Sequence, residues 1–182
     1  MRLVTYGGAI SLDGFLAAAD GSIDWLHFSK DVQEVVTNYW KNVDTILMGR
    51  KTYEVSLAQN QKESDQTKEP AIRTYVFSRT IAAIETPGAE LVSSDAIEFI
   101  RDLKQRQGNE ICLMGGGELA QSLFAAGLID QVGLNIHPVL LGSGIPVFRD
   151  SGHRLRLKLM ECRTIDGGCI LANYTVLHDG SL

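Results

Sequence analysis

The sequence predicts an α/β fold with a central, mostly parallel sheet that ends in an antiparallel hairpin. Short apolar runs alternate with segments of helical period over most of the chain, which is typical of parallel strands joined by crossover helices. The last two strand-like runs, 155–164 and 169–177, are separated by Asp166-Gly167-Gly168, a hairpin turn signal. No linker or internal repeat divides the 182 residues, so we expect one domain over residues 1–182.

The individual elements follow from local patterns. Before the hairpin, strands rich in β-branched and aromatic residues are expected over residues 2–10, 43–48, 72–78, 90–92, 110–114 and 131–137. Apolar residues at helical spacing predict helices over 29–41, 50–57, 95–107 and 118–126. Ser29 is a candidate N-cap for the first helix, and Ser94 or Asp95 for the third. Residues 59–69 and 138–144 are expected to be loops.

Composition excludes several classes of function. The net charge of −5 argues against nucleic acid as a partner, because duplex binding needs a basic face. No apolar run approaches the roughly 20 residues of a membrane span, and the chain begins with a strand-like run rather than a signal peptide. Cys112, Cys162 and Cys169 have no zinc-ligand spacing, so we expect no metal and a cytoplasmic protein with reduced thiols.

Two glycine-containing junctions carry the functional signal. Each follows an apolar strand and opens a helix, at Gly49-Arg50-Lys51-Thr52 and at Gly115-Gly116-Gly117-Glu118. Unpaired N–H groups and the helix dipole make such a junction suitable for a phosphate. Cations in the first turn of a helix, as in the first junction, are slightly disfavoured unless an anion is bound there. The two junctions together predict a site for a phosphorylated dinucleotide.

These segments, in this order, resemble the dihydrofolate reductase-like superfamily. The closer likeness is to the branch that contains the reductase domain of bacterial riboflavin biosynthesis. The resemblance covers nearly the whole chain and rests on Ser11-Leu12-Asp13-Gly14, Asp24-Trp25, Met48-Gly49-Arg50-Lys51-Thr52-Tyr53-Glu54, Ser78-Arg79, Met114-Gly115-Gly116-Gly117-Glu118-Leu119 and residues 137–148. It implies a three-layer fold, a reductase that takes hydride from NADPH, and commonly a homodimer.

The resemblance also implies roles for particular residues. In the family the triple glycine lies against the pyrophosphate and nicotinamide ribose, and the loop after the first strand folds over the nicotinamide. The resemblance therefore implies that the cofactor is bound by Asp13, Gly14, Gly49, Arg50, Lys51, Thr52, Ser78, Arg79, Gly115, Gly116, Gly117 and Glu118. Three consecutive glycines exceed what a tight turn needs, whereas Glu118 is equally explained by its favourable position at a helix N-terminus.

The substrate side is less strongly marked. Asp24 is the candidate catalytic carboxylate, although it also suits a loop or capping position. Trp25, Tyr53 and His137 are candidate substrate contacts, and a structural role is open for each of them. Classical dihydrofolate reductases carry an acid further past the tryptophan. The same distance past Trp25 reaches Lys30 in this chain, which is not an acid, and this argues against folate itself as the substrate.

The sequence therefore predicts an NADPH-dependent reductase that acts on a small conjugated heterocycle, either pterin-like or pyrimidine-like. One alternative is 5-amino-6-(5-phosphoribosylamino)uracil reductase of riboflavin biosynthesis, although no second basic cluster marks a site for its ribose phosphate. Another is a dimeric nucleotide-binding protein without turnover. The apolar segments 134–136 and 139–141 are the expected dimer surface.

Overall fold

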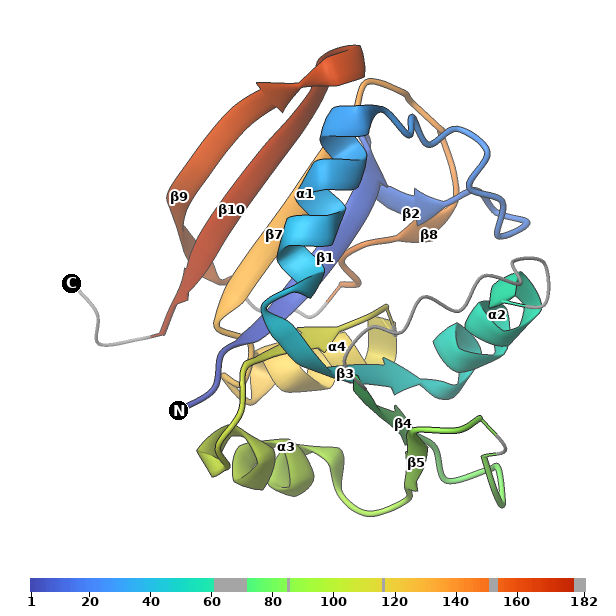
Figure 1. The fold of residues 1–182 in the computed structure, drawn as a ribbon, viewed down its shortest axis with the longest axis vertical. Coiled ribbons are helices and arrows are strands. Elements are labelled where there is room, and N and C mark those ends of the chain that lie inside the picture. Colours follow the sequence, from blue (N-terminus) through green and yellow to red (C-terminus); the bar gives the residue numbers. More distant parts are fainter. Residues whose placement is uncertain (61–71, 85, 116, 151–153, 179–182) are drawn as a thin grey trace.

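The computed structural model describes residues 1–60, 72–84, 86–115, 117–150 and 154–178 (Figure 1). The strands are β1 (Val4–Ser11), β2 (Phe15–Ala17), β3 (Val43–Gly49), β4 (Arg73–Phe77), β5 (Ala89–Val92), β6 (Glu110–Leu113), β7 (Gln131–His137), β8 (Ile145–Pro146), β9 (Arg156–Ile165) and β10 (Cys169–Leu177). The helices are α1 (Lys30–Trp40), α2 (Arg50–Asn60), α3 (Ala96–Gln105) and α4 (Gly117–Ala125), and a 3₁₀ turn, η1 (Asp166–Gly168), joins the last two strands.

Eight of the strands form one sheet in the order β5-β4-β3-β6-β1-β7-β10-β9. The pairs from β5 to β7 are parallel, and β10 pairs antiparallel with both β7 and β9. The predicted fold class, a mostly parallel sheet with an antiparallel C-terminal hairpin, is confirmed. The sequence patterns missed the small second sheet, in which β2 and β8 pair antiparallel.

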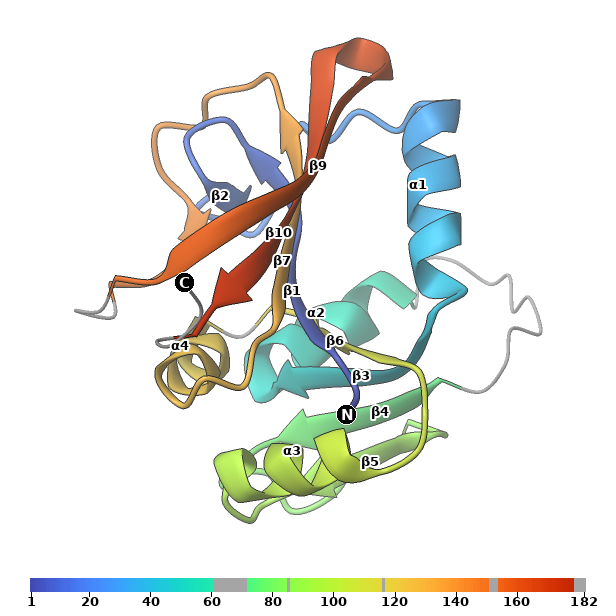
Figure 2. The same ribbon diagram turned by 90° about the vertical axis from the view of Figure 1, so that its left-hand side faces the viewer.

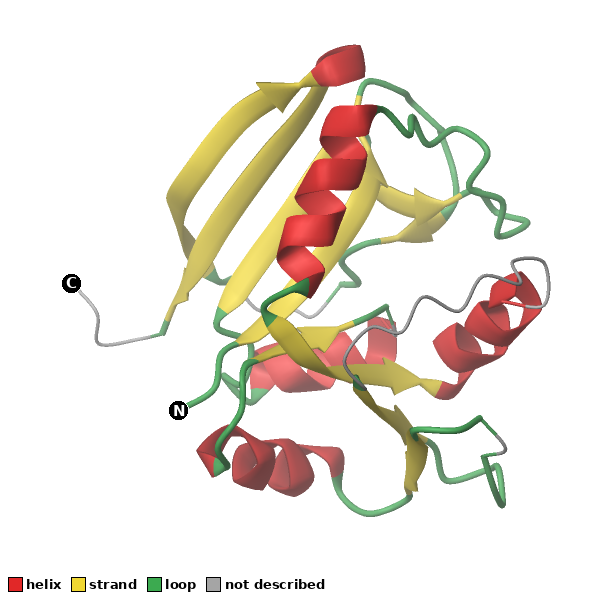
Figure 3. Cartoon of the chain, viewed as in Figure 1, coloured by secondary structure: helices red, strands yellow, loops and turns green. Residues whose placement is uncertain are grey.

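Helices cover both faces of the sheet, which gives three layers (Figures 2 and 3). The larger core lies between the sheet and α3 and α4, where the even-numbered β1 residues Val4, Tyr6 and Ile10 are buried. On the opposite face, Tyr53 of α2 packs on Met48 and Val76. The N-terminal part of α1 covers a smaller cluster near the β9–β10 turn. None of the described helices is long and apolar enough to cross a membrane.

Local signals set the helix starts as predicted. The Ser29 hydroxyl accepts a hydrogen bond from the Val32 amide at 3.2 Å. Asp95 caps α3 by accepting from the amides of Ile97 and Glu98 at 2.9 and 3.0 Å. Such caps satisfy N–H groups that have no partner inside the helix. They fix where each helix leaves its preceding loop.

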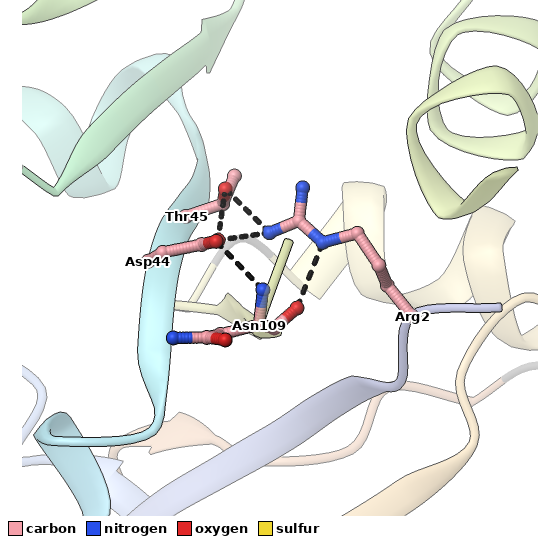
Figure 4. A network of polar contacts seen from close by, with 4 residues as sticks. All are labelled: Arg2, Asp44, Thr45 and Asn109. Carbon is pink, nitrogen blue, oxygen red and sulfur yellow. Dashed lines mark hydrogen bonds and ion pairs between the residues drawn. The ribbon is translucent and has the colours of Figure 1, made fainter. Parts of the chain in front are cut away.

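An ionic network holds together the amino-terminal ends of the strands (Figure 4). The buried Arg2 guanidinium forms an ion pair with Asp44, donates to the Thr45 hydroxyl at 2.7 Å and donates to the Asn109 carbonyl at 2.7 Å. The Asn109 amide donates back to Asp44 at 2.7 Å. The network therefore links the start of β1 to β3 and to the residue before β6, at the edge opposite the two glycine junctions.

The strand expected to supply part of a dimer surface is internal. β7 lies between β1 and β10, and Leu134 and Ile136 pack against the larger core. Both edges of this strand are therefore occupied by neighbouring strands, and the expected dimer surface at 134–136 stays a prediction. In the segment 139–141, Leu140 does lie at the surface.

Candidate functional site

The carboxyl ends of the parallel strands bring most of the predicted site residues to one edge of the sheet. β1 ends at Ser11, β3 at Gly49, β4 at Phe77, β6 at Leu113 and β7 at His137. Ligands in open α/β sheets bind at this edge. In Figure 1 it is the right-hand side, where α2 and the β2–β8 pair lie. The edge is therefore the candidate site.

The two glycine junctions touch each other. The Met114 amide donates to the Leu47 carbonyl at 2.8 Å, which sets the ends of β6 and β3 side by side. Gly115 adopts a φ of +62°, and a Cβ at this position would lie 2.7 Å from the Thr52 hydroxyl. Only glycine meets both conditions without strain. Gly116 lies outside the described residues, so its predicted role is not addressed by the structure.

Arg149 closes the other side of the glycine turn, and the sequence patterns did not identify it. A Cβ on Gly117 would lie 2.5 Å from Arg149 Nε. The guanidinium lies 3.6 Å from the Glu118 carboxylate, and both side chains are partly or largely exposed. Arg149 is 12 residues past the end of β7 and belongs to no local motif. The structure therefore places a second arginine, besides Arg50, at the junctions.

The predicted basic residues lie at the surface of this edge. Arg50 donates to Glu54 at 2.8 Å in an exposed i,i+4 pair, and Lys51 and Arg79 are exposed. Ser78 accepts hydrogen bonds from the amides of the turn that follows it, at 3.2 and 3.4 Å. Its hydroxyl therefore shapes the turn that carries Arg79.

Asp13 ties together two loops at the same edge. Its carboxylate accepts from the Ser11 hydroxyl at 2.6 Å and from the amides of Leu141 and Gly142 at 3.1 and 2.7 Å. These hydrogen bonds, the Ser11 bond foremost, lower the pKa of Asp13. The Asp13 side chain thus fixes the loop after β1 to the loop after β7. Gly14 continues this loop, and its carbonyl accepts from the Val147 amide at 2.9 Å.

His137 is a buried, neutral histidine with a defined tautomer. It is 2% exposed, and burial, with a smaller contribution from His27, lowers its pKa. Its Nδ1 accepts from the His27 amide at 3.2 Å, so the ring proton is on Nε2, which lies 3.2 Å from the Asn135 amide group. The Asn135 oxygen has no partner among the described residues; with the amide turned so that its oxygen faces Nε2, the oxygen accepts from the ring N–H.

Trp25 lies against His137, whereas Tyr53 is elsewhere. The Trp25 ring meets the His137 ring edge-on, with centroids 5.6 Å apart. Its indole N–H is buried and has no acceptor among the described residues. Asp24, next to it, is exposed, and the structure gives it no hydrogen bond or ion pair with the described residues. Tyr53 is buried in the α2 core and its hydroxyl bonds to Thr86 at 2.7 Å, so the structure does not bring it to Trp25 and His137.

Comparison with known proteins identifies the family of the chain. The sequence model of the RibD C-terminal domain matches residues 2–171. The chain belongs to the RibD C-terminal domain family. Within the curated proteins it is similar to the uncharacterized protein YyaP of Bacillus subtilis (strain 168), at 34% identity over 173 residues that cover 91% of this chain and 90% of YyaP.

Solved structures share the fold of this RibD C-terminal domain. A crystal structure from Shewanella sp. PV-4 matches with a TM-score of 0.83 at 24% identity, over 97% of this chain and 100% of that chain. Dihydrofolate reductase from Enterococcus faecalis, complexed with NADP(H), matches with a TM-score of 0.67 at 14% identity, over 96% of each chain. The predicted dihydrofolate reductase-like fold is confirmed.

Proposed function

We propose that this RibD C-terminal domain protein is an NADPH-dependent reductase that transfers hydride to a small conjugated heterocycle, either pterin-like or pyrimidine-like. The observation that carries the proposal is the contact between the two glycine junctions, at Thr52 and Gly115. It puts two helix N-termini side by side at the ligand edge. Family membership and the similarity in fold to a reductase complexed with NADP(H) support the same assignment.

The residues at the junctions fit the phosphates of NADPH. Gly115 packs directly against Thr52, which brings the glycine turn beside the first turn of α2. Amides of both segments could then bind one pyrophosphate. Arg50 and Arg149 each face an exposed carboxylate, Glu54 and Glu118. Exposed ion pairs of this kind are weak. A phosphate can therefore replace either carboxylate as the partner of the arginine.

Apolar side chains at the same edge suit a planar ring. Leu12, directly after β1, is 61% exposed, and Phe28, one residue before the cap of α1, is 64% exposed. Bound NADPH would supply the hydride from its nicotinamide ring. The protein's part is to hold the two rings in contact and to exclude water from them. We propose that Leu12 and Phe28 are among the apolar groups that do so.

Trp25 and Asp24 indicate the polarity of the substrate. The buried Trp25 N–H has no acceptor among the described residues, and a carbonyl or ring nitrogen of a pterin or pyrimidine would supply one. His137 is held neutral and its ring nitrogens are both engaged, so it positions Trp25 rather than delivering a proton. Asp24, exposed beside Trp25, is the proposed catalytic carboxylate.

Two narrower assignments remain as outcomes of the test. Membership of the RibD C-terminal domain family favours 5-amino-6-(5-phosphoribosylamino)uracil as one substrate. A nucleotide-binding protein without turnover is the other outcome. Substrates with and without a ribose phosphate distinguish a riboflavin-pathway reductase from a reductase of free heterocycles.

The test is a titration of NADPH and NADH by nucleotide fluorescence against wild type, Arg50→Ala and Arg73→Ala. Arg73 is an exposed arginine at the amino end of β4, away from the junctions, and serves as the matched control. Losing a charge-assisted phosphate contact costs about 1.5–3 kcal/mol, so we expect Arg50→Ala to weaken NADPH binding about tenfold or more and Arg73→Ala to leave it unchanged.

The binding result decides how the search for a substrate proceeds. Binding of NADPH followed by its oxidation with one of the heterocycles identifies the substrate. Binding without oxidation across the panel supports the nucleotide-binding alternative. If wild type binds neither nucleotide, the glycine junctions are structural and the reductase assignment is wrong.

A further inference from the structure

The tip of the last hairpin lies beside the segment that carries Trp25. This hairpin tip is residues 165–169, which are the end of β9, the η1 turn and the start of β10. In Figure 1 it is the red turn at the top, next to the N-terminal end of α1, and Figure 2 shows both at the same end of the molecule. Residues 24–28, which we call the substrate loop, lead into that end of α1. None of the predicted site residues belongs to the hairpin tip.

Apolar packing anchors the hairpin tip on α1. Ile165, Cys169 and Val32 form one cluster, in which they are 7%, 0% and 3% exposed. The Asp166 amide also donates to the Asp31 carboxylate at 3.4 Å. Buried side chains in contact pack as closely as those of a core. The hairpin tip is therefore fixed to the first turn of α1, directly after the substrate loop.

The imidazole of His27 lies directly against Gly167. Gly167 has a φ of +76°, and a Cβ at this position would lie 2.7 Å from His27 Nε2 and 3.1 Å from Cγ. The Asp166 carboxylate is 3.9 Å from the same Nε2, but the two side chains are 52% and 68% exposed. Exposed ion pairs contribute little. The shape of the turn, rather than its charge, therefore determines where the His27 side chain lies.

A second contact passes through His137. Cys169 Sγ lies 3.5 Å from His137 Nδ1, the atom that accepts from the His27 amide at 3.2 Å. Burial, with a smaller contribution from Asp166, raises the pKa of the Cys169 thiol. The thiol therefore keeps its proton at neutral pH and can donate to this nitrogen. His137 also packs on the Trp25 ring, so the hairpin tip contacts the residue that holds both His27 and Trp25.

We infer that the hairpin tip is the positioning element of the substrate loop, with Gly167 and Cys169 as its positioning residues. Gly167 sets the place of the His27 side chain, and Cys169 packs against the histidine that holds the backbone of the loop. Neither residue acts on a substrate directly, because Cys169 is fully buried and Gly167 has no side chain. Only the assignment of residues 24–28 to the substrate rests on the proposed function.

The test is amide hydrogen exchange followed by NMR and read at position 27. Gly167→Ala is expected to displace the His27 imidazole and to lower the protection factor of the His27 amide at least about tenfold. Gly168→Ala is the matched control, because Gly168 has a φ of +75° and both variants carry the same backbone cost. Among the described residues, a Cβ on Gly168 would meet only Pro138 Cγ, at 3.7 Å. The difference between the two variants therefore measures the contact with His27.

A second substitution shows whether the effect passes through the imidazole. His27→Ala removes the ring and keeps the backbone amide, so in this background Gly167→Ala should change the protection factor at position 27 by less than about twofold. His27→Ala alone loses the contact without straining the turn, and it should lower protection about fivefold. This variant keeps the test if Gly167→Ala does not fold. Equal protection in Gly167→Ala and Gly168→Ala, or unchanged protection in His27→Ala, would overturn the positioning role.

The emission of Trp25 gives an independent reading of the same loop. The chain has two tryptophans, so in a Trp40→Phe background the emission is that of Trp25. Its indole N–H is buried, and displacement of the loop exposes it to water. The emission should therefore shift to longer wavelength in Gly167→Ala and not in Gly168→Ala. An unchanged emission in Gly167→Ala would overturn the link between the hairpin tip and Trp25.

Neither readout depends on the reductase function. The hairpin tip lies beside α1 rather than at the glycine junctions (Figure 1), so the dissociation constant for NADPH should stay within about twofold of wild type in these variants. A loss of NADPH affinity as large as the loss of protection would overturn the assignment of the hairpin tip to the substrate loop. If wild type binds no NADPH, the proposed function fails, and the exchange and emission results still decide whether the hairpin tip positions the loop.

Discussion

The contact between Gly115 and Thr52 can be tested by adding a methyl group and then removing its obstacle. Alanine at position 115 would keep the φ of +62°, which costs about 1–2 kcal/mol for a residue with a Cβ. The new Cβ would also lie 2.7 Å from Thr52 Oγ1 and 3.1 Å from Cγ2, and such overpacking costs about 1–3 kcal/mol. Gly115→Ala is therefore expected to lower the free energy of unfolding by about 2–5 kcal/mol.

Two further variants separate these contributions. Gly88 has a φ of +80°, and a Cβ added there would have no other atom within 4 Å, so Gly88→Ala carries only the backbone cost of about 1–2 kcal/mol. Thr52→Ala removes Oγ1 and Cγ2 and leaves a contact of 3.5 Å to the Thr52 Cβ. In a double-mutant cycle, Thr52→Ala should then recover about 1–3 kcal/mol of the loss caused by Gly115→Ala.

Urea unfolding at 25 °C gives the free energies, and NADPH titration of the same variants gives the link to function. Gly115→Ala should bind NADPH at least about tenfold more weakly, and Gly88→Ala should bind like wild type. A coupling energy below about 0.5 kcal/mol would refute the described packing of the two junctions. A clear coupling with unchanged NADPH affinity would refute the cofactor assignment and leave the packing intact.

Two further predictions concern stability. Arg2→Met removes the partner of Asp44 in the network of Figure 4. It should lower the free energy of unfolding, measured by urea unfolding, by about 2–3 kcal/mol, less than for a fully buried pair because Asp44 is partly exposed. A change in NADPH affinity would contradict the placement of this network at the edge opposite the candidate site. The pKa of His137 in the folded protein lies below its ordinary 6.5, so the unfolded state takes up the proton first as the pH falls. The free energy of unfolding therefore decreases below pH 6.5, by up to about 1.4 kcal/mol per pH unit, until the pH reaches the pKa of His137 in the folded protein. His137→Asn should remove this part of the pH dependence, and equal slopes in both proteins would contradict it.

The features that were predictable from sequence are those set by neighbouring residues. Ser29 and Asp95 cap their helices because a cap needs only a side-chain oxygen two or three residues before free amides. The hairpin of β9 and β10 follows from its Asp166-Gly167-Gly168 turn in the same way. The glycine junctions were visible for the same reason, and the parallel sheet then brings them together.

The features that were missed depend on residues far apart in the chain. β2 and β8 have three and two residues, too few for an alternating pattern to show. Arg149 reaches the turn at Gly117 across more than 30 residues of sequence. Tyr53 was expected at the site because it follows Thr52, but one helical position turns the side chain by about 100°, and it enters the core beside Met48 instead.

The same distinction separates the two halves of the candidate site. The proposed cofactor half is backbone, made of turns whose N–H groups would bind phosphate, and such turns recur wherever the local glycines recur. The substrate half is built from side chains of separate segments: Trp25 and His27 precede α1, and His137 lies 110 residues later, at the end of β7. Because His137 is buried and holds this loop through the His27 amide, changes at Asp24 and Trp25 alter what the site presents to a substrate without disturbing the cofactor turns. Substrate choice among relatives should therefore vary with residues 24–28. Exchanging this segment with the matching one of YyaP should change which heterocycle is reduced, while the affinity for NADPH stays within about twofold.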